Sequence, residues 1–357
     1  MLQQIIKGDS RVKERLDQYL SKAFELGASD IHLTVGVTPM MRLHGKLKPI
    51  GEELLMPMDT EEMARAMIPN HLWTSFKERG EIDFSYSIQG LSRFRVNAYH
   101  QRSCVSIAIR VIPQTIPTFE QLNLPPVLKS VIKKQQGLIL VTGPTGSGKS
   151  TTLAAMIDEM NKTVEKHIVT LEDPIEYLHR HHKCIIDQRE VGFDTRSFAN
   201  GLRACLRQDP DVILVGEMRD LETISTAITA AETGHLVLAT LHTTDAPTTI
   251  DRIIDVFPGE QQGQVRIQLA SVLEAVVSQR LFPLKDGNGR AAAFEVLINN
   301  PAVRNLIRNE KIHQIHSIMQ TSRSAGMQTL KMSVQSLVNE GKISMDSALP
   351  FLSEGMK

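Results

Sequence analysis

Cysteine is scarce in this 357-residue sequence, and the three present, Cys104, Cys184 and Cys205, form no Cys-x-x-Cys pair. This spacing argues against a disulfide framework or a zinc knuckle and fits a reducing compartment. Net charge is also absent, since 40 basic residues balance 40 acidic ones, so composition does not point to nucleic acid or an anionic membrane. No apolar run approaches the roughly 20 residues of a membrane span, and the charged N-terminus is unlike a signal peptide. We therefore expect a cytoplasmic protein of about two domains, with membrane contact only through a partner.

The stretch Gly137–Thr152, GLILVTGPTGSGKSTT, is typical of a phosphate-binding loop and rarely arises as an ordinary strand-to-helix turn. Its apolar start predicts a buried parallel strand, its glycines allow backbone N–H groups to turn inward, and a helix is expected from Lys149. Lys149 is expected to contact the β- and γ-phosphates, and Ser150 to bind Mg²⁺. The predicted cradle consists of Gly143, Pro144, Thr145, Gly146, Ser147, Gly148, Lys149, Ser150 and Thr151.

Residues 1–111 predict an α+β domain with an antiparallel sheet. Alternation over Arg93–Tyr99 puts Phe94, Val96 and Ala98 on one sheet face and Arg95 on the other, where a solvated polar face is the default interpretation. The expected elements are a helix over Arg11–Leu26, a strand pair within Asp30–Leu47, a helix over Asp59–Arg79, and strands at Ile82–Ile88, Arg93–His100 and Cys104–Val111.

Residues 112–126 contain four prolines and are predicted to link this domain to a second one, residues 127–357. There, strands alternate with helices, which indicates a mostly parallel sheet with flanking helices. Strands are expected at His167–Leu171, Lys183–Gln188, Val212–Val215 and Leu236–Thr240, and helices at Ser150–Asn161, Ser197–Arg207 and Leu221–Thr233. From Asp245 onward the pattern favours helices with one short strand near Ala291–Val296.

Acidic residues follow two of the predicted strands. Many NTPases with this cradle end a second strand in an Asp that fixes Mg²⁺, but here Gly216 takes that place and Glu217 follows it. Glu217 is therefore the candidate to orient or deprotonate an attacking water. Glu172 and Asp173, directly after the strand at His167–Leu171, could hold Mg²⁺ through its waters, although acidic residues before proline are also common turn formers.

Histidines suggest two further sites, a phosphate contact and a metal site, and we retain only the first as a candidate. His242 follows a predicted strand and could bond the γ-phosphate, although a single histidine is more often just a hydrogen-bonded residue. His179, His181 and His182 resemble a metal site, but without paired Cys or a placed carboxylate we interpret them as an exposed loop.

Four blocks, GPTGSGKST, LEDPIEY, LRQDPDVILVGEMRD and GHLVLATLHTTDAP, occur in this order. Together they closely resemble the Walker A, Asp, Walker B and His boxes of the secretion ATPase superfamily, the hexameric motors of type II secretion and type IV pili. GASDIHLTVG and RFRVNAYHQR resemble the PAS-like first domain of that family. The resemblance implies a RecA-like P-loop NTPase domain preceded by an α+β PAS-like domain, and a homohexameric ring that binds ATP and Mg²⁺ between subunits.

The same resemblance implies roles for individual residues. Glu217 becomes the catalytic acid, Glu172 and Asp173 the Mg²⁺-associated carboxylates, and His242 the γ-phosphate contact. Arg95 and Arg110 match first-domain arginines that reach the nucleotide, and the arginines that match the motor interface are Arg203, Arg207, Arg219 and Arg280. We interpret the chain as a motor in which ATP closes the crevice between the two domains and hydrolysis reopens it.

Within the superfamily, the likeness is greatest to the pilus retraction ATPases of twitching motility. The four-cysteine zinc insertion usual in the extension and type II secretion members is absent, and Ala302–Arg308, AVRNLIR, resembles the retraction motif. Asn309 stands where that motif generally continues with Glu, which leaves an accessory retraction motor open. The implied partner is the inner-membrane platform protein of the pilus.

Four alternatives remain at this stage. A type II secretion or pilus-extension motor shares the four blocks. A RecA-like nucleic-acid translocase shares the core, but aromatics are only 4% of the chain, so stacking platforms are scarce and we expect no nucleic-acid partner. A small-molecule kinase uses the same cradle and would need an acceptor for turnover. A non-hydrolysing regulatory subunit is disfavoured because Lys149 and Glu217 are both present.

Overall fold

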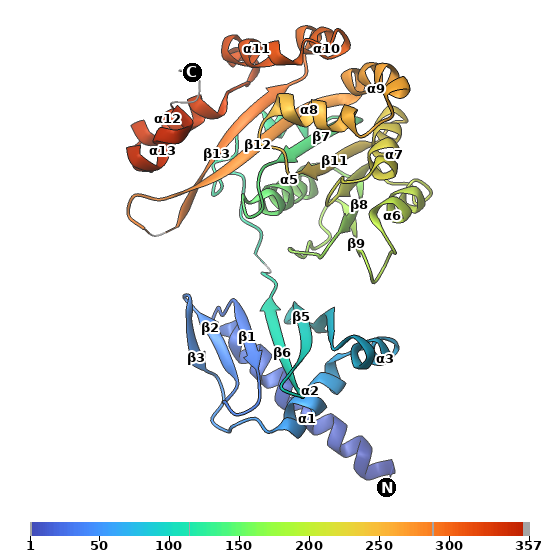
Figure 1. The fold of residues 1–357 in the computed structure, drawn as a ribbon, viewed down its shortest axis with the longest axis vertical. Helices are drawn as coiled ribbons and strands as arrows, with labels where there is room; N and C mark the ends of the chain where they lie inside the picture. The colour runs from blue at the N-terminus through green and yellow to red at the C-terminus, as the bar shows by residue number, and fades with distance from the viewer. Residues whose placement is uncertain (1, 114, 288, 353–357) are drawn as a thin grey trace. The chain divides into compact units, whose positions relative to one another are not determined.

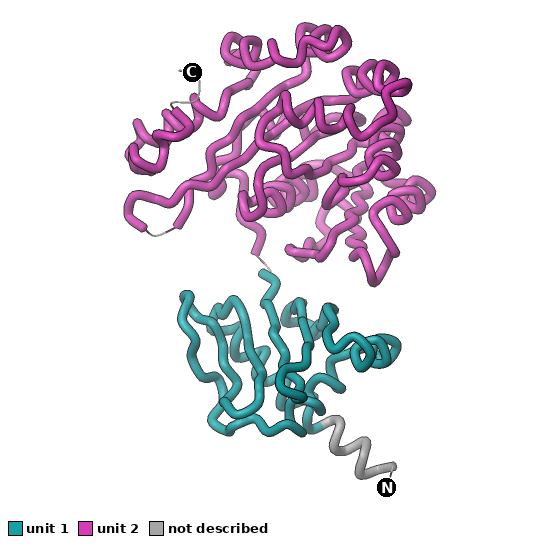
Figure 2. The backbone as a smooth tube through the Cα atoms, in the orientation of Figure 1, with its two compact units in different colours: residues 1–114 teal, residues 115–357 magenta. Residues whose placement is uncertain are grey.

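The computed structural model describes residues 2–113, 115–287 and 289–352. The chain forms two compact units, residues 1–114 and residues 115–357, drawn in different colours in Figure 2. Among the described residues, no helix combines the length and the apolar character that crossing a bilayer requires.

The described residues of unit 1, 2–113, form a six-stranded antiparallel sheet with three helices, which confirms the predicted α+β class. The strand order is β3-β2-β1-β6-β5-β4, so sequence-distant β1 and β6 pair in its centre. The elements are α1 (Leu2–Glu25), β1 (Asp30–Leu33), β2 (Met40–Leu43), β3 (Lys46–Pro49), α2 (Pro57–Met67), α3 (Asn70–Arg79), β4 (Glu81–Ile88), β5 (Ser92–Gln101) and β6 (Cys104–Val111).

Two expectations for unit 1 were wrong in detail. The helix expected over Asp59–Arg79 is two helices, because Pro69 has no N–H to continue the hydrogen-bond ladder and holds Ile68 in an extended conformation. The expected strand pair is three strands, since His44 and Gly45 both take positive φ and form a tight turn between β2 and β3. The alternation in β5 is confirmed, with Phe94 buried and Arg95 exposed.

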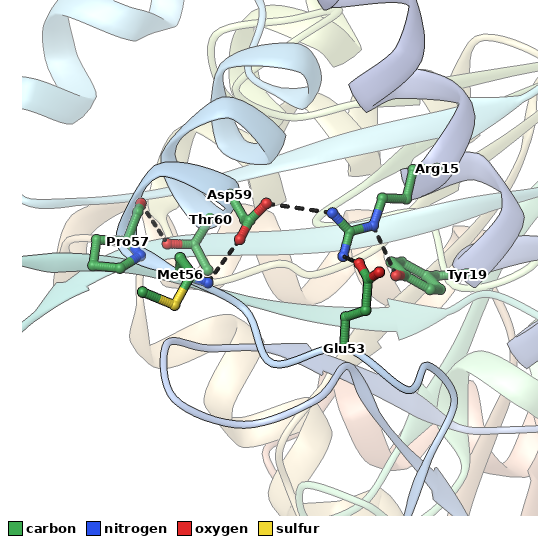
Figure 3. A network of polar contacts seen from close by, with 7 residues as sticks. All are labelled: Arg15, Tyr19, Glu53, Met56, Pro57, Asp59 and Thr60. Carbon is green, nitrogen blue, oxygen red and sulfur yellow. Dashed lines mark hydrogen bonds and ion pairs between the residues drawn. The ribbon is translucent and has the colours of Figure 1, made fainter.

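Helices α1 and α2 of unit 1 are joined by a polar network around Arg15 (Figure 3). The Arg15 guanidinium of α1 lies 3.2 Å from a Glu53 carboxylate oxygen and 3.3 Å from one of Asp59 in α2, and its Nε donates to the Tyr19 hydroxyl. Asp59 also accepts the backbone N–H of Met56, which satisfies a free donor at the start of α2. Apolar packing between these helices and one face of the sheet forms the core, for example at Leu16, Met63 and Phe94.

Unit 2 (residues 115–357) is built on a seven-stranded sheet in which all strands except β13 run parallel. The strand order is β13-β12-β7-β11-β10-β8-β9 (Figure 1). The strands are β7 (Gly137–Thr142), β8 (His167–Glu172), β9 (Ile185–Glu190), β10 (Val212–Val215), β11 (Leu236–Leu241), β12 (Leu273–Pro283) and β13 (Arg290–Ile298). The helices are α4 (Leu128–Val131), α5 (Lys149–Thr163), α6 (Phe198–Cys205), α7 (Leu221–Glu232), α8 (Ala246–Asp255), α9 (Gly259–Val272), α10 (Pro301–Arg308), α11 (Ile315–Thr321), α12 (Leu330–Asn339) and α13 (Met345–Leu352), with 3₁₀ turns at Ile312–Gln314 and Arg323–Ala325.

Strand β7 is buried on both faces, as its apolar run predicts. Leu138 and Leu140 belong to one core cluster and Ile139 and Val141 to another, because successive side chains of a strand point to opposite faces. The second cluster also contains Phe119 and Leu124, so part of the proline-rich interval 112–126 packs into unit 2. The linker role of that interval stays a prediction.

The expectation of helix after Asp245 was wrong for Leu273–Pro283, which forms β12, while the short strand expected near Ala291–Val296 is confirmed within β13. Strand β12 runs parallel to β7, and β13 returns antiparallel to β12 over nine residue pairs. Apolar residues of β12 also fit a helical spacing, and pairing with β7, more than a hundred residues away in sequence, favours the strand. This strand places Ser278, Gln279 and Arg280 next to the predicted cradle.

Candidate active site

A cavity of about 850 Å³ lies at the carboxyl ends of the parallel strands in unit 2. Its walls include the cradle after β7, the acidic segment after β8, and the residues that follow β10 and β11. Parallel sheets bind ligands at this edge, and the volume falls within the range of small-molecule sites, roughly 300–1,000 Å³. The structure therefore gathers the four sequence blocks around one cavity.

The cradle requires glycine at two positions because β12 lies against it. Gly143 has φ 142°, and a Cβ there would lie 2.4 Å from the backbone oxygen of Gln279. Gly148 has φ 90°, and a Cβ there would lie 2.8 Å from the Gln279 Nε2. Helix α5 starts directly after Gly148, so its free N–H groups and positive dipole end adjoin the cavity. The predicted strand, loop and helix are confirmed.

Lys149 is buried, with 8% of its surface exposed, and its ammonium group is held at the loop. Nζ donates to the backbone oxygens of Gly143 at 2.8 Å and Pro144 at 3.2 Å. Burial lowers the pKa of the Lys149 ammonium, while the charges of Glu217 and Glu176 act in the opposite direction. These carboxylates favour a charged Lys149, as phosphate binding requires.

Glu217 and Lys149 are bridged by His242. The His242 Nε2 lies 2.8 Å from the Glu217 Oε1, and its Nδ1 lies 3.4 Å from the Lys149 Nζ. Since an ammonium group can only donate and a carboxylate only accept, a neutral His242 with its proton on Nε2 satisfies both contacts. Glu217 Oε1 also accepts from Arg219. The arrangement connects the candidate phosphate-binding group with the candidate water-directing group.

Gly216 replaces the usual Asp because the chain is crowded at this point. A Cβ on Gly216 would lie 2.9 Å from the backbone oxygen of Leu171 and 3.3 Å from the Cα of Glu172 and from the Phe198 ring. The backbone N–H of Gly216 donates to the same Leu171 oxygen at 2.7 Å. A side chain at Gly216 would therefore require the backbone of β8 to shift.

We expect Gly216→Asp to destabilise the fold by about 1–3 kcal/mol, because the new side chain must displace backbone atoms. Urea unfolding of the purified protein measures this. Gly263→Ala in α9 is the control: nothing lies within 4 Å of its Cβ position. That change should stabilise the helix by roughly 0.5–1 kcal/mol. An unchanged urea midpoint for Gly216→Asp would show that the strands can separate at little cost.

The carboxylates at the end of β8 and in the loop that follows have different environments. Glu172 is held by its Oε1, which accepts from the Thr170 hydroxyl at 2.6 Å and from the Gln188 Nε2 at 3.0 Å. Burial raises the pKa of the Glu172 carboxyl, and these two hydrogen bonds oppose the shift. Asp173 and Glu176 are exposed and also line the cavity.

Ser150, Glu172 and Asp173 all line this cavity and offer the hard oxygen donors that Mg²⁺ prefers. In the described part of the chain, no three His, Cys, Asp or Glu side chains converge as a metal-holding group. Mg²⁺ keeps several waters and uses one or two protein carboxylates, and Glu172 and Asp173 are two carboxylates at this wall. The residues present therefore fit the predicted magnesium site.

Sequence reasoning missed residues that support the cradle from other strands and loops. Gln279 of β12 is 4% exposed, and its Oε1 accepts from the Thr152 hydroxyl of α5 at 2.7 Å. The Tyr177 hydroxyl lies 2.9 Å from that of Thr151. Arg290 also lines the cavity. No local pattern marks these residues, because their partners are distant in sequence.

The histidine-rich loop is only partly as expected. His181 and His182 are exposed, and the His181 Nδ1 accepts the backbone N–H of Ile186 at 3.0 Å. The interpretation as an exposed loop was wrong for His179, which lines the cavity with a buried Nδ1. Burial lowers the pKa of His179 to about 4, so this side chain is neutral at pH 7.

The predicted arginines of unit 2 are dispersed. Arg219 lines the cavity beside Glu217, and Arg280 lies along the outer side of the cradle with its guanidinium 5.0 Å from the centre of the Phe351 ring. Arg203 and Arg207 are exposed, and Arg203 forms an ion pair with Glu222 at 2.7 Å. Neither Arg203 nor Arg207 is among the described residues that line the cavity. The role of both arginines at a subunit interface stays a prediction.

The predicted arginines of unit 1 are cross-strand neighbours. Arg95 of β5 is paired directly with Arg110 of β6, and both are exposed. Like charges in this position repel, and the Asp30 carboxylate 3.2 Å from Arg110 offsets the repulsion, as does Asp83 at 4.0 Å from Arg95. The sheet thus presents two guanidinium groups side by side, while their contact with nucleotide stays a prediction.

A mostly parallel sheet with a phosphate cradle after β7, an acidic residue after β10 and a carboxylate loop after β8 defines a P-loop NTPase of RecA-like fold. The model of the family described as Type II/IV secretion system protein matches residues 6–350, and the chain belongs to this family.

Similar curated proteins cover most of the chain. The type IV pilus retraction ATPase PilT of Pseudomonas aeruginosa is 49% identical over 93% of this chain and 96% of its own length. A twitching motility protein of Neisseria gonorrhoeae is 50% identical over 87% of this chain and 83% of its own. The type IV pilus ATPase PilU of Pseudomonas aeruginosa is 43% identical over 93% of this chain and 87% of its own length.

Solved structures agree with these relatives. The pilus retraction motor PilT with bound ADP is 50% identical and superposes with a TM-score of 0.86 over 93% of this chain and 95% of its own. The ATPase DotB of Legionella pneumophila is 30% identical with a TM-score of 0.83 over 95% of both chains. The predicted α/β fold is confirmed, and the chain is an ATPase of this family that uses a nucleotide. The PAS-like likeness of the first domain stays a prediction.

Proposed function

We propose that this ATPase is the motor that powers type IV pilus retraction and thereby twitching motility. The observation that carries the proposal is that three candidate turnover groups meet in one cavity: Lys149, His242 and Glu217 are linked in a continuous chain of contacts. The identity of 49% with a retraction ATPase over 93% of the chain supports retraction over extension as the direction of the motor. A non-hydrolysing subunit would have no need for this arrangement.

The chemistry follows from the groups that line the cavity. Lys149 and the start of α5 would bind the β- and γ-phosphates of ATP, and Glu217 would orient or deprotonate the attacking water. His242 would hold Glu217 in place and contact the γ-phosphate through its position beside Lys149. Ser150, Glu172 and Asp173 would hold Mg²⁺, which when bound neutralises charge on the phosphates.

We further propose that six copies form the working ring and that the nucleotide lies between subunits. In this proposal Arg95 and Arg110 supply positive charge to the γ-phosphate. The arginines proposed for the subunit interface are Arg203, Arg207, Arg219 and Arg280. Residues 1–111 would act as the first domain, 112–126 as the linker and 127–357 as the motor domain. The ring would bind the platform protein of the pilus at the cytoplasmic face of the inner membrane.

Arg95→Ala and Arg110→Ala should each lower ATP turnover about tenfold or more while the protein stays folded and oligomeric, because each removes a charge proposed to stabilise the transition state. Steady-state phosphate release and size-exclusion chromatography measure the two properties. Arg102→Ala, an exposed arginine of the β5–β6 turn, should turn over ATP like the wild type. Wild-type rates in oligomeric Arg95→Ala and Arg110→Ala would leave these arginines as an ordinary solvated sheet face.

Deletion of the gene tests the direction of the motor. If the chain drives retraction, cells without it should carry surplus pili that do not shorten, and bald cells would instead identify an extension motor. An accessory retraction motor is the second candidate, because Asn309 stands where the retraction motif generally continues with Glu. In that case the deletion strain should still retract pili, with reduced force.

A further inference from the structure

The loop between β8 and β9 supplies the carboxylate side of the cavity. Two side chains of β9 hold its backbone: Glu190 accepts the N–H of Ile175 at 3.3 Å, and Gln188 bonds the segment further along. The loop carries Asp173, Glu176 and Tyr177 into the cavity wall. Gln188 of β9 pairs with Thr170 of β8 across the sheet, so it lies directly behind this loop. Gln188 is half-buried and does not itself line the cavity.

All hydrogen-bonding groups of the Gln188 amide are used. Nε2 donates to the Glu172 Oε1 at 3.0 Å and to the backbone oxygen of Tyr177 at 2.8 Å. Oε1 accepts the backbone N–H of His179 at 2.9 Å. The reverse orientation would set the amide oxygen against two acceptors and the NH₂ group against a donor, so the amide has one acceptable orientation.

These contacts join the segments that surround the acidic side of the cavity. Glu172 Oε1 is fixed by Thr170 and Gln188 together, which determines where the rest of the carboxylate points. The loop backbone is held on both sides of Leu178, through Tyr177 and His179. The Tyr177 hydroxyl then contacts Thr151 in the first turn of α5. A displacement of Gln188 would therefore be transmitted to both the carboxylate and the cradle.

We propose that Gln188 is a positioning residue for the hydrolysis reaction: it sets the direction of the Glu172 carboxylate and the place of the β8–β9 loop, and so governs how tightly Mg²⁺ is held with the nucleotide. The inference rests on the proposed function of the cavity. Gln188 touches neither the phosphates nor the water, and acts through Glu172 and Tyr177. Outer partners of metal-binding carboxylates commonly change metal affinity or activity about 10- to 100-fold.

Two variants separate hydrogen bonding from packing. In Gln188→Met the side chain keeps a similar length but has no amide donor or acceptor. In Gln188→Glu the side chain keeps its shape, but a carboxylate oxygen faces the Glu172 carboxylate and the backbone oxygen of Tyr177. Gln328→Met is the matched control, since Gln328 is also half-buried and its Nε2 donates to the backbone oxygen of Phe294 at 2.9 Å. We would measure three quantities. These are the turnover rate as a function of ATP and Mg²⁺ concentration, the affinity for ADP with and without Mg²⁺, and the hydrogen exchange of residues 174–184.

For both Gln188 variants, kcat should fall and the Mg²⁺ concentration at half-maximal turnover should rise, each about 10- to 100-fold. Without Mg²⁺, the ADP affinity of both variants should equal that of the wild type. The increase in ADP affinity that Mg²⁺ causes in the wild type should be lost. Backbone amides of residues 174–184 should exchange hydrogen faster. Gln328→Met should change none of these.

Wild-type kcat and Mg²⁺ dependence in both variants would overturn the positioning role. Parallel losses of kcat and of Mg²⁺-free ADP affinity would also overturn it, because they indicate general unfolding of the site. If the wild type itself turned over no ATP, the proposed function would fail. The Mg²⁺ effect on ADP affinity and the loop exchange would still decide the role of Gln188.

Discussion

Glu217→Gln should bind ADP like the wild type and hydrolyse ATP about 100- to 10,000-fold more slowly, the range that a positioned general base contributes. The amide has the same shape, so packing at the end of β10 is preserved. The amide of the variant cannot accept a proton from water. It also lacks the negative charge of the Glu217 carboxylate, which His242 and Arg219 both contact. Phosphate release at saturating ATP and ADP titration measure turnover and binding separately.

The control for this variant is Glu232→Gln, an exposed glutamate at the end of α7 whose carboxylate accepts from Gln268 at 2.9 Å. It removes one negative charge from the same unit away from the cavity, so turnover should be unchanged. Equal turnover in Glu217→Gln and the wild type would remove Glu217 from the reaction, and the carboxylates after β8 would have to direct the water.

Lys149→Ala should weaken both nucleotide binding and turnover. Charged hydrogen bonds contribute about 1.5–3 kcal/mol each, so the loss of the ammonium group should lower ADP affinity roughly 10- to 100-fold. Turnover should fall further, because the same group would neutralise the γ-phosphate in the transition state. Titration of ADP and phosphate release at several ATP concentrations measure the two effects.

Lys162→Ala on the same helix is the matched control. Its ammonium group is half-exposed and pairs with Asp158 one turn earlier, away from the cradle, so its loss should leave both quantities unchanged. Wild-type ADP affinity in Lys149→Ala would mean that the backbone N–H groups of the cradle alone hold the phosphates.

The parts of the site that are local in sequence could be predicted. The strand at β7, the glycines of the cradle and the start of α5 follow one another within sixteen residues, so spacing and residue type define them. Glu217 and His242 could be found because each follows a short buried strand. Alternation in β5 likewise predicted that Arg95 is exposed.

The parts that depend on distant pairing could not be predicted. Gln279 contacts Thr152 across 127 positions, and its strand β12 was read as helix because pairing with β7 leaves no local signal. The reason for Gly216 also lies outside its own strand, in the backbone of Leu171. Gln188 stood in a predicted strand, but its three partners all belong to the preceding strand and loop.

The break between α2 and α3 is a different kind of miss. Pro69 is a local signal for a helix boundary, and it lies inside the single helix expected over Asp59–Arg79. The covalent restriction at this proline ends α2 before it. His179 is another miss, since the lack of paired Cys or a placed carboxylate led to an exposed loop, while the fold buries the Nδ1 of its ring.

Pilus length in living cells tests the central claim most directly. Cells that lack the native gene receive either the wild-type chain or Glu217→Gln at equal levels, and the shortening of fluorescently labelled pili is recorded. The account predicts that wild-type cells retract their pili, whereas Glu217→Gln cells keep long, static pili in surplus. Retraction at wild-type speed with Glu217→Gln, or failure of the wild-type chain to restore it, would contradict the claim that ATP hydrolysis in this cavity drives retraction.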